Sequence, residues 1–99
     1  MTINKALESG TVTLTMKGKL STTTSPQFQE ALTSALNEAK QIILDFKEVD
    51  YVASAGLRVL LLGEKNAKAS GKIMTLINVS ADIMEIFDVT GFTGILNIK

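Results

Sequence analysis

The chain has 99 residues, which is room for one small domain with a single hydrophobic core and none for a second. Its 45% hydrophobic and 20% charged residues are typical of a folded globular chain. Ten basic residues balance ten acidic ones, and no run of like charges occurs. This charge pattern excludes an electrostatic footprint for nucleic acid or an anionic membrane surface. Histidine and cysteine are absent, which excludes disulfides, Ser-His-Asp or Cys-His catalysis and the usual zinc sites.

Alternating side chains predict the first clear strand, over residues 11–20. Apolar residues alternate there with threonines, as expected of a strand with one buried face, and Gly18 marks a bend or bulge before Leu20. The stretch TINKAL at residues 2–7 is a further strand candidate, with a turn at 8–10. The inward positions of the first clear strand are Val12, Leu14 and Met16.

An amphipathic helix is predicted next, over roughly residues 25–39. Its apolar side chains recur every three or four residues and form one stripe. Ser25 is expected to be the N-cap, and Pro26 then takes the first helical position, where its missing N–H costs nothing. The stripe consists of Phe28, Ala31, Leu32, Ala35, Leu36 and Ala39.

A buried strand follows at residues 41–46, which are short and almost entirely apolar. Residues 47–53 then form a connecting segment that turns Val49 and Val52 inward. From Ser54 or Ala55 to about residue 70 the pattern is helical again, and a glycine at position 71 ends it. Its buried face carries Leu57, Leu60, Leu61 and Ala67, widened by Val59 and Leu62, so we expect burial on more than one side.

The remaining residues predict strand, helix and strand. Residues 72–78 form another apolar strand, Ser80 caps a short helix that bears Ile83, Ile86 and Phe87, Gly91 closes this helix, and residues 94–98 supply the last strand. Strands that alternate with helices predict an α/β domain, with parallel strand pairs joined by crossover helices after an antiparallel start.

The stretch VASAGL, residues 52–57, places one hydroxyl at the start of a helix. Ser54 is interpretable as an N-cap, which contributes about 1 kcal/mol. It is also suited to phosphorylation, because Ala53 and Ala55 leave it accessible and a helix N-terminus favours a phosphate. Gly56 costs up to about 1 kcal/mol in a helix and so needs a reason, such as close approach by another molecule. A hydrolase nucleophile is excluded, because the G-x-S-x-G pattern is incomplete and no histidine can act as base.

The blocks IILDFKEVDYVASAGLRVLL, SGKIMTLINVSADIMEIFDVTGF and ILNI resemble the STAS domain of bacterial anti-sigma-factor antagonists, over nearly the whole chain from VTLTMKGKL onward. The specific part is Asp45, Ser54, Gly56 and Leu57, reinforced by Ser80 and by the pair Thr90-Gly91. The resemblance implies one STAS-type domain over residues 1–99, with a mixed four- to five-stranded sheet packed against three to four helices.

The same resemblance implies a phosphorylation switch that works by protein binding, without a cofactor and without enzyme activity. Ser54 would be phosphorylated by a partner that is both anti-sigma factor and serine kinase and that binds the nucleotide. The unmodified chain would bind this partner and release the sigma factor, and a serine phosphatase would reset the phosphorylated form. The implied partner-binding residues are Ser21, Thr22, Asp45, Ala53, Ala55, Gly56, Leu57 and Arg58.

Three positions depart from the pattern of that family. Many members have an acid or a serine where this chain has Ala53, and a second small polar residue where it has Ala55. The first-strand motif of the family often ends in an acid, where this chain has Ser21. Because that acid tends to lie beside the phosphoserine, Ser21 affects the expected partner affinity rather than the fold.

Several side chains have a second interpretation. Asp45 either lines the recognition surface near Ser54 or accepts backbone hydrogen bonds in the turn after its strand. The threonine-rich loop that contains Thr22 is interpreted first as a turn and cap region, and second as a surface that contacts the partner. The acidic residues of the last helix, Asp82, Glu85 and Asp88, are interpreted as a solvated face rather than a metal site.

Two alternative functions also fit the sequence. One is a stand-alone STAS subunit of a lipid or solute transport complex, docking on an ATPase. The other is a structural partner in a sensory complex, with Ser54 never modified. With neither a signal-peptide core nor a stretch of about 20 apolar residues, we expect a cytoplasmic chain without direct membrane or nucleic-acid contact.

Overall fold

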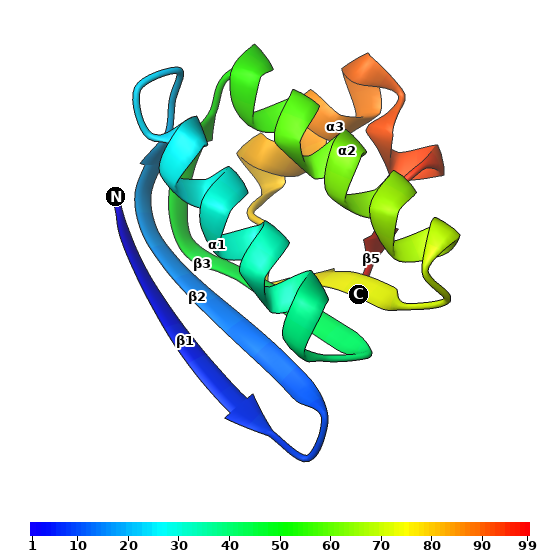
Figure 1. Cartoon of the computed structure of the whole chain (residues 1–99). Helices are drawn as coiled ribbons and strands as arrows, with labels where there is room; N and C mark the ends of the chain where they lie inside the picture. Colours follow the sequence, from blue (N-terminus) through cyan, green and yellow to red (C-terminus); the bar gives the residue numbers. More distant parts are fainter.

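A five-stranded mixed sheet forms the frame of the computed structural model, which describes residues 1–99 (Figure 1). The strands lie in the order β1-β2-β3-β4-β5. β1 pairs antiparallel with β2, and every other neighbouring pair is parallel, so the predicted mixed sheet with an antiparallel start is confirmed. The strands are β1 Thr2–Glu8, β2 Thr11–Leu20, β3 Gln41–Val52, β4 Ile73–Ile77 and β5 Asn97–Ile98.

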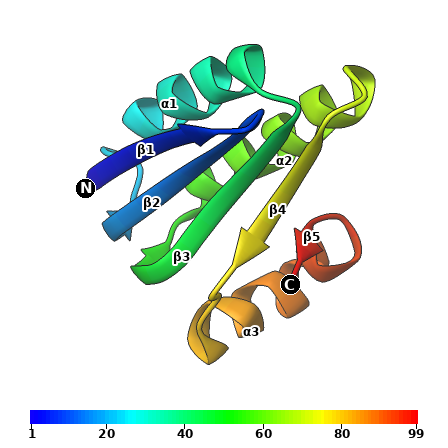
Figure 2. The same cartoon turned by 90° about the horizontal axis from the view of Figure 1, so that it is seen from below.

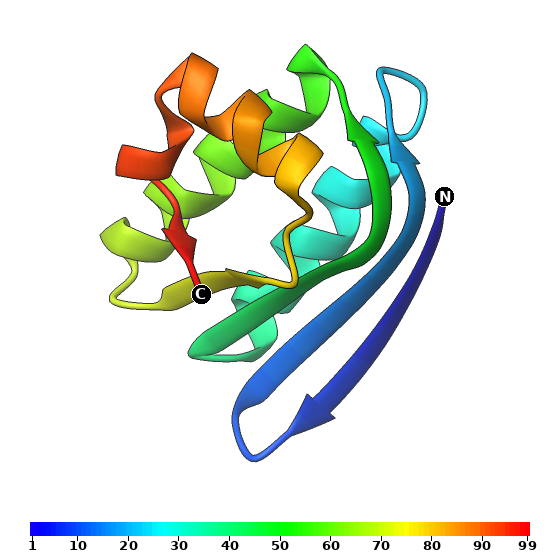
Figure 3. The same cartoon turned by 180° about the vertical axis from the view of Figure 1, so that it is seen from behind.

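Three α-helices and one 3-10 turn complete the fold: α1 Ser25–Glu38, α2 Ser54–Ala69, α3 Ala81–Thr90 and η1 Phe92–Gly94. α1 and α2 lie side by side over the sheet (Figure 1). α3 lies on the other side of α2, at the opposite side of the molecule from α1 (Figure 2). Seen from behind, the strands curve around one side of the helices, and no strand covers the side of the helices that faces away from the sheet (Figure 3).

The core forms between this sheet and its helices as the sequence predicts. The inward side chains of β2 and most of the α1 stripe are buried, and α3 joins the core through Phe87, which packs edge-on against Phe46 of β3 and stacks on Phe92. The predicted ends of the last helix are confirmed: the Ser80 hydroxyl accepts a hydrogen bond from the Ile83 N–H, and Gly91 has the left-handed backbone that favours glycine, with φ 81°.

β3 is longer than its apolar pattern predicts. Residues 47–52, expected to be a connecting segment, continue the strand, although Val49 and Val52 do turn inward as predicted. The pairing with β2 shifts register twice, after Thr15 and at Gly18, so inward side chains recur every third residue instead of every second. The last strand is shorter than expected, because Gly94 belongs to η1 and the chain turns at Ile95 and Leu96 before β5 begins.

The buried side of α2 is narrower than the sequence suggests. Leu60 and Val59 are buried, whereas Leu61 is only half-buried and Leu62 is 46% exposed. The expectation of burial on more than one side is therefore wrong for Leu62. Gly63 lies close to α1 and β4, because an added Cβ would lie 2.5 Å from a methyl group of Leu32 and 3.2 Å from the sulfur of Met74.

Glu64 is a buried acid on the same side of α2, with 6% of its surface exposed. Burial raises the pKa of its carboxyl group, and the nearby Lys68 ammonium offsets part of this rise. Because the folded chain therefore holds this proton more tightly than the unfolded chain, Glu64 costs no stability below its unfolded pKa. Its cost grows as the pH rises through the folded pKa and is constant above it.

Replacing Glu64 with glutamine removes this cost, so we expect Glu64→Gln to raise the free energy of unfolding at pH 7. The gain over wild type should shrink as the pH falls towards about 4, where the glutamate of both states becomes protonated. Urea unfolding of both proteins between about pH 4 and pH 8 measures this difference. Glu85→Gln, at an exposed position, is the control, and a Glu64→Gln difference that does not vary with pH would contradict the expectation.

Candidate functional site

Ser54 is the first residue of α2, and its side chain is exposed. The N-cap is Ala53, whose carbonyl accepts the first helical hydrogen bond from the Leu57 N–H at 3.0 Å. The expectation that Ser54 caps the helix is therefore wrong by one residue. The Ser54 hydroxyl makes no hydrogen bond within the chain and faces solvent from the first turn, between two alanines.

Backbone pairing brings the loop after β2 to the start of α2. Leu20 pairs with Val52 at the ends of β2 and β3, and the Leu20 carbonyl accepts a hydrogen bond from the Ala53 N–H at 2.8 Å. Ser21, the next residue, therefore lies beside the turn that leads into Ser54. Two candidate residues that are 33 positions apart in the sequence meet at this end of the sheet.

The loop of residues 21–25 is held by its own hydroxyl groups. The Thr24 hydroxyl accepts from the Ser21 N–H at 2.8 Å and donates to the Lys19 carbonyl at 2.7 Å. The buried Ser25 hydroxyl donates to the Ser21 carbonyl at 2.5 Å, so Ser25 is not the N-cap that we expect from the sequence. Thr24 takes the cap position without a capping side-chain bond. Thr22 keeps an exposed side chain.

Gly56 lies against the end of β2. A Cβ at this position would lie 2.6 Å from Leu20 Cγ and 3.2 Å from the Leu20 carbonyl oxygen, and both Gly56 and Leu20 are buried. The reason for a glycine here is therefore close packing within the chain, not the approach of another molecule. Leu57 is also half-buried against the core, so only part of its side chain is open to a partner.

We expect Gly56→Ala to lower the free energy of unfolding. Overpacking against a fully buried leucine costs about 1–3 kcal/mol, which outweighs the gain of up to about 1 kcal/mol from the higher helix propensity of alanine. Gly94→Ala is a matched control, because nothing lies within 4 Å of a Cβ at that position and its backbone needs no positive φ. Urea midpoints measure both variants, and a fully stable Gly56→Ala protein would show that Leu20 can move aside.

A cleft of about 390 Å³ opens beside Ser54, between the starts of α1 and α2. Three predicted contact residues, Thr22, Ala55 and Arg58, line it together. Arg58 is the only charged residue of the lining, and it makes no ion pair. The other lining residues are Ser25, Pro26, Gln29, Val59 and Leu62.

Asp45 lies away from this group. It sits in the interior of β3, seven residues before the strand ends, which is up to about 23 Å of extended chain. One carboxylate oxygen accepts hydrogen bonds from the Lys47 N–H at 3.0 Å and from the Asn78 side chain at 3.1 Å. The structure thus shows the hydrogen-bonding role, although Lys47 belongs to the continuing strand and not to a turn.

Tyr51 is a surface residue that the sequence interpretation missed. It is 46% exposed and pairs with Lys19 of β2, whose ammonium lies 5.8 Å from the centre of the ring. Lys19 also lies 3.8 Å from a carboxylate oxygen of Asp50. A signal exists in the sequence: an aromatic residue directly before the inward Val52 must point outward once this segment is a strand.

No three His, Cys, Asp or Glu side chains are grouped so that they could hold a metal ion. None of the helices is both long and apolar enough to cross a membrane. What the site offers chemically is one accessible hydroxyl, one unpaired cation and a partly apolar cleft.

Comparison with known sequences finds a matching family model and curated relatives. The family model described as "Mlab, STAS domain" matches residues 3–97. The anti-sigma-B factor antagonist of Bacillus subtilis is 26% identical over 88 residues, which are 89% of this chain and 81% of that protein.

Solved structures with the same fold include the anti-sigma factor antagonist SpoIIAA in its unphosphorylated form, with a TM-score of 0.78 and 17% identity over 99% of this chain and 87% of that one. SpoIIAA from Bacillus in the phosphorylated form matches with a TM-score of 0.77 and 18% identity, over 99% and 91% of the two chains. A sulfate transporter family protein from Wolinella succinogenes matches with a TM-score of 0.80 and 19% identity, over 94% and 76%.

Proposed function

This chain belongs to the STAS domain family, and on that premise we propose that it is an anti-sigma factor antagonist that is switched off by phosphorylation of Ser54. In this proposal the unmodified chain binds an anti-sigma factor that is also a serine kinase, and so releases the sigma factor. The chain acts by binding and not as an enzyme. The observation that carries the proposal is the exposed, unbonded Ser54 hydroxyl at the start of α2.

The position of Ser54 suits a reversible charge. A phosphoserine carries about −1.5 to −2 charges at pH 7. At the N-terminus of α2 this charge meets the free N–H groups and the positive end of the helix dipole, which stabilises the domain by about 0.3–1 kcal/mol. Phosphorylation can therefore change the binding surface without unfolding the domain that presents it.

The neighbours of Ser54 favour binding of the unmodified form. Ala53 and Ala55 add almost no bulk, and no carboxylate lines the adjacent cleft. A partner surface can therefore close over the neutral hydroxyl, and a phosphate in the same place would have to lose its water against that surface. The Ser21 hydroxyl, where many family members carry an acid, lies within hydrogen-bond distance of the Thr24 hydroxyl, at 3.3 Å.

Ser54→Ala tests whether this serine acts through chemistry or through stability. Because Ser54 makes no capping bond, we expect the free energy of unfolding to change by less than about 0.5 kcal/mol, while phosphate incorporation by the cognate kinase is lost. Ser80→Ala is the matched control, since it removes a real cap bond and should cost about 1 kcal/mol. If Ser54→Ala incorporates as much phosphate as wild type, Ser54 is not the modified residue, and Ser21, Thr22 and Ser80 are the next candidates.

Docking on the ATPase of a transport complex, without phosphorylation, is the second candidate. It is favoured by the fold shared with the sulfate transporter family protein. Affinity purification of the chain from its own cells separates the two functions, because the first recovers a kinase-type anti-sigma factor and the second recovers an ATPase with its permease. The Ser54→Ala variant should still bind the partner that wild type recovers, in either case.

A further inference from the structure

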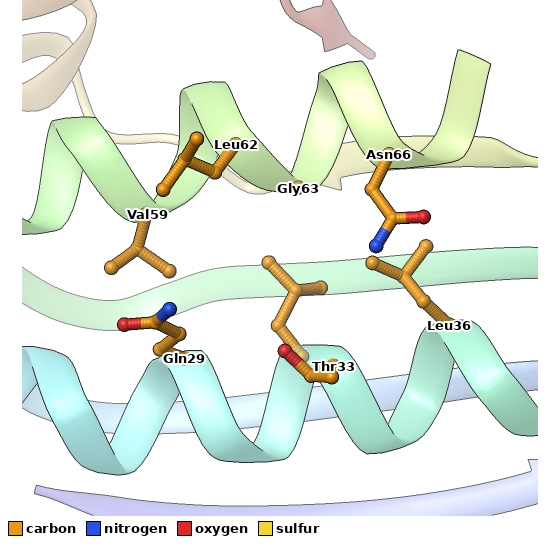
Figure 4. Close-up of a pocket in the computed structure, with 8 residues that line it drawn as sticks. Gln29, Thr33, Leu36, Val59, Leu62, Gly63 and Asn66 are labelled. Carbon is orange, nitrogen blue, oxygen red and sulfur yellow. The ribbon is translucent and has the colours of Figure 1, made fainter. Parts of the chain in front are cut away.

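A groove runs between α1 and α2, starting at the end that carries Ser54. Two adjoining hollows of about 390 and 250 Å³ form it, and both are lined by Gln29, Val59 and Leu62. Figure 4 shows the side chains of the two helices facing each other across the second hollow. Leu62 lies in the wall of the groove with 46% of its surface exposed, so almost half of this apolar side chain is open to solvent.

The groove is cationic at one end and has no acid. Arg58 is the only charged residue in the lining of either hollow, and it makes no ion pair. Leu62 follows Arg58 by four residues, so the two side chains lie one turn apart on the same side of α2, about 6 Å along the helix axis. A ligand that satisfies both residues must present a carboxylate and an aliphatic side chain about one helical turn apart.

The outer side of α3 has this pattern. Ile83 and Phe87 bury the inner side of the helix, and the opposite side presents Asp82, Glu85 and Val89. Val89 is 82% exposed, the highest value among the large apolar residues of the chain. Glu85 and Val89 are four residues apart, the same spacing as Arg58 and Leu62, and Glu85 makes no ion pair.

The two surfaces cannot meet within one chain, because α1 and α3 lie at opposite sides of the molecule (Figure 2). We propose that the α1–α2 groove binds the outer side of α3 from a second copy of this chain. In this contact Glu85 pairs with Arg58 and Val89 packs against Leu62. Opposite charge and matching helical spacing make a second copy the occupant that fits.

The contact joins two different surfaces, so each copy keeps one free groove and one free α3. Association of this kind continues from copy to copy, closing into a ring or growing into a row. One helix against a shallow groove is a small interface, and we therefore expect weak, concentration-dependent association. Because the contact needs neither phosphorylation nor another protein, its test is independent of the proposed function.

The experiment is sedimentation velocity of the unmodified chain alone, from micromolar to millimolar concentration. We expect the mean mass of wild type to rise with concentration. Leu62→Asp places a charge in the apolar wall of the groove, and Val89→Asp places a charge on the outer side of α3. Each variant should therefore raise the dissociation constant at least tenfold. Both residues are exposed, and circular dichroism with thermal melting shows whether each variant is folded. A wild type that stays monomeric throughout would overturn the proposal.

Mixing the two variants gives the decisive result. The Leu62→Asp protein keeps a sound α3 and the Val89→Asp protein keeps a sound groove, so the mixture can form one contact and no more. We expect a one-to-one dimer that does not grow further. Association that persists in each variant alone, or a mixture that stays monomeric while wild type associates, contradicts the proposal.

Charge exchange tests the ion pair separately. Arg58→Glu and Glu85→Arg should each weaken the association, and the chain that carries both changes should recover most of it. Glu8→Arg, at an exposed position in β1, is the control for net charge. If the exchange fails to restore association, Glu85 and Arg58 do not pair. If wild type is monomeric and Leu62→Asp instead loses an anti-sigma partner, the groove belongs to that partner and the proposal is wrong.

Discussion

Leu60→Ala should destabilise the domain by about 2–5 kcal/mol, the usual cost of truncating a fully buried leucine. Leu60 lies on the buried side of α2, in the core that the helices share with the sheet. Removing its methyl groups loses their burial and leaves a cavity that close-packed neighbours fill only in part. For a domain of this size such a loss is a large share of the whole free energy of unfolding, so the urea midpoint should fall clearly.

Leu62→Ala is the matched control for this prediction. It makes the same chemical change two residues along the same helix, where the side chain is 46% exposed. Its cost should be clearly smaller, about 1 kcal/mol or less, because only about half of this side chain is buried. Equal costs for the two variants would show that the assignment of the buried side of α2 is wrong. The pair also checks that the groove variants of Leu62 act on binding and not on folding.

Ser54→Asp should weaken binding of the anti-sigma partner at least tenfold without unfolding the chain. Aspartate supplies part of the charge of a phosphoserine. At the start of α2 that charge is favourable to the helix by about 0.3–1 kcal/mol, so melting should stay level or rise slightly. Against the partner, the same charge must lose its water at a surface that fits a neutral hydroxyl, and this costs several kcal/mol.

Calorimetric titration of the partner with wild type and with Ser54→Asp measures this effect. Thr93→Asp is a useful control, because it adds the same charge at an exposed position outside the candidate site. The effect at Ser54 should be the larger one, since only Ser54 belongs to the proposed binding surface. Equal affinities of wild type and Ser54→Asp, with both proteins folded, would show that Ser54 is not part of the binding surface.

The elements that the sequence predicts best are those with a regular hydrophobic period. The inward side chains of β2 and the stripe of α1 follow directly from a period of two and a period of about 3.6, and both are confirmed. The second half of β3 breaks the rule because its pairing with β2 shifts register, which places inward residues three apart. Such a shift depends on the partner strand, so the local pattern cannot reveal it.

The starts of the helices show a second limit of prediction from the sequence. At Ser80 the capping serine is identified correctly, whereas Ser54 and Ser25 each prove to be the first residue inside the helix. A serine favours both positions, and the choice between them is made by tertiary contacts. The bond from the Ala53 N–H to the Leu20 carbonyl fixes where α2 begins. The same contact explains Gly56, whose role depends on a residue 36 positions earlier in the chain.

The fold brings the candidate site residues together in part. Ser21, Thr22 and Arg58 do gather around the start of α2, because β2 and β3 end side by side. Asp45 does not join them, since the unpredicted extension of β3 separates it from Ser54. The outward position of Tyr51 follows from the inward Val52 only once residues 47–52 are known to be a strand, and the expected connecting segment concealed it.

The most direct test of the switch is intact-mass analysis of the chain isolated from its own cells, followed by mapping of the modified residue. We predict a species about 80 Da heavier than the unmodified chain, the mass of one added phosphoryl group, with the phosphate on Ser54. The fraction of this species should change when the sigma-dependent response is induced. A chain that is never modified at Ser54 under either condition would contradict the central claim.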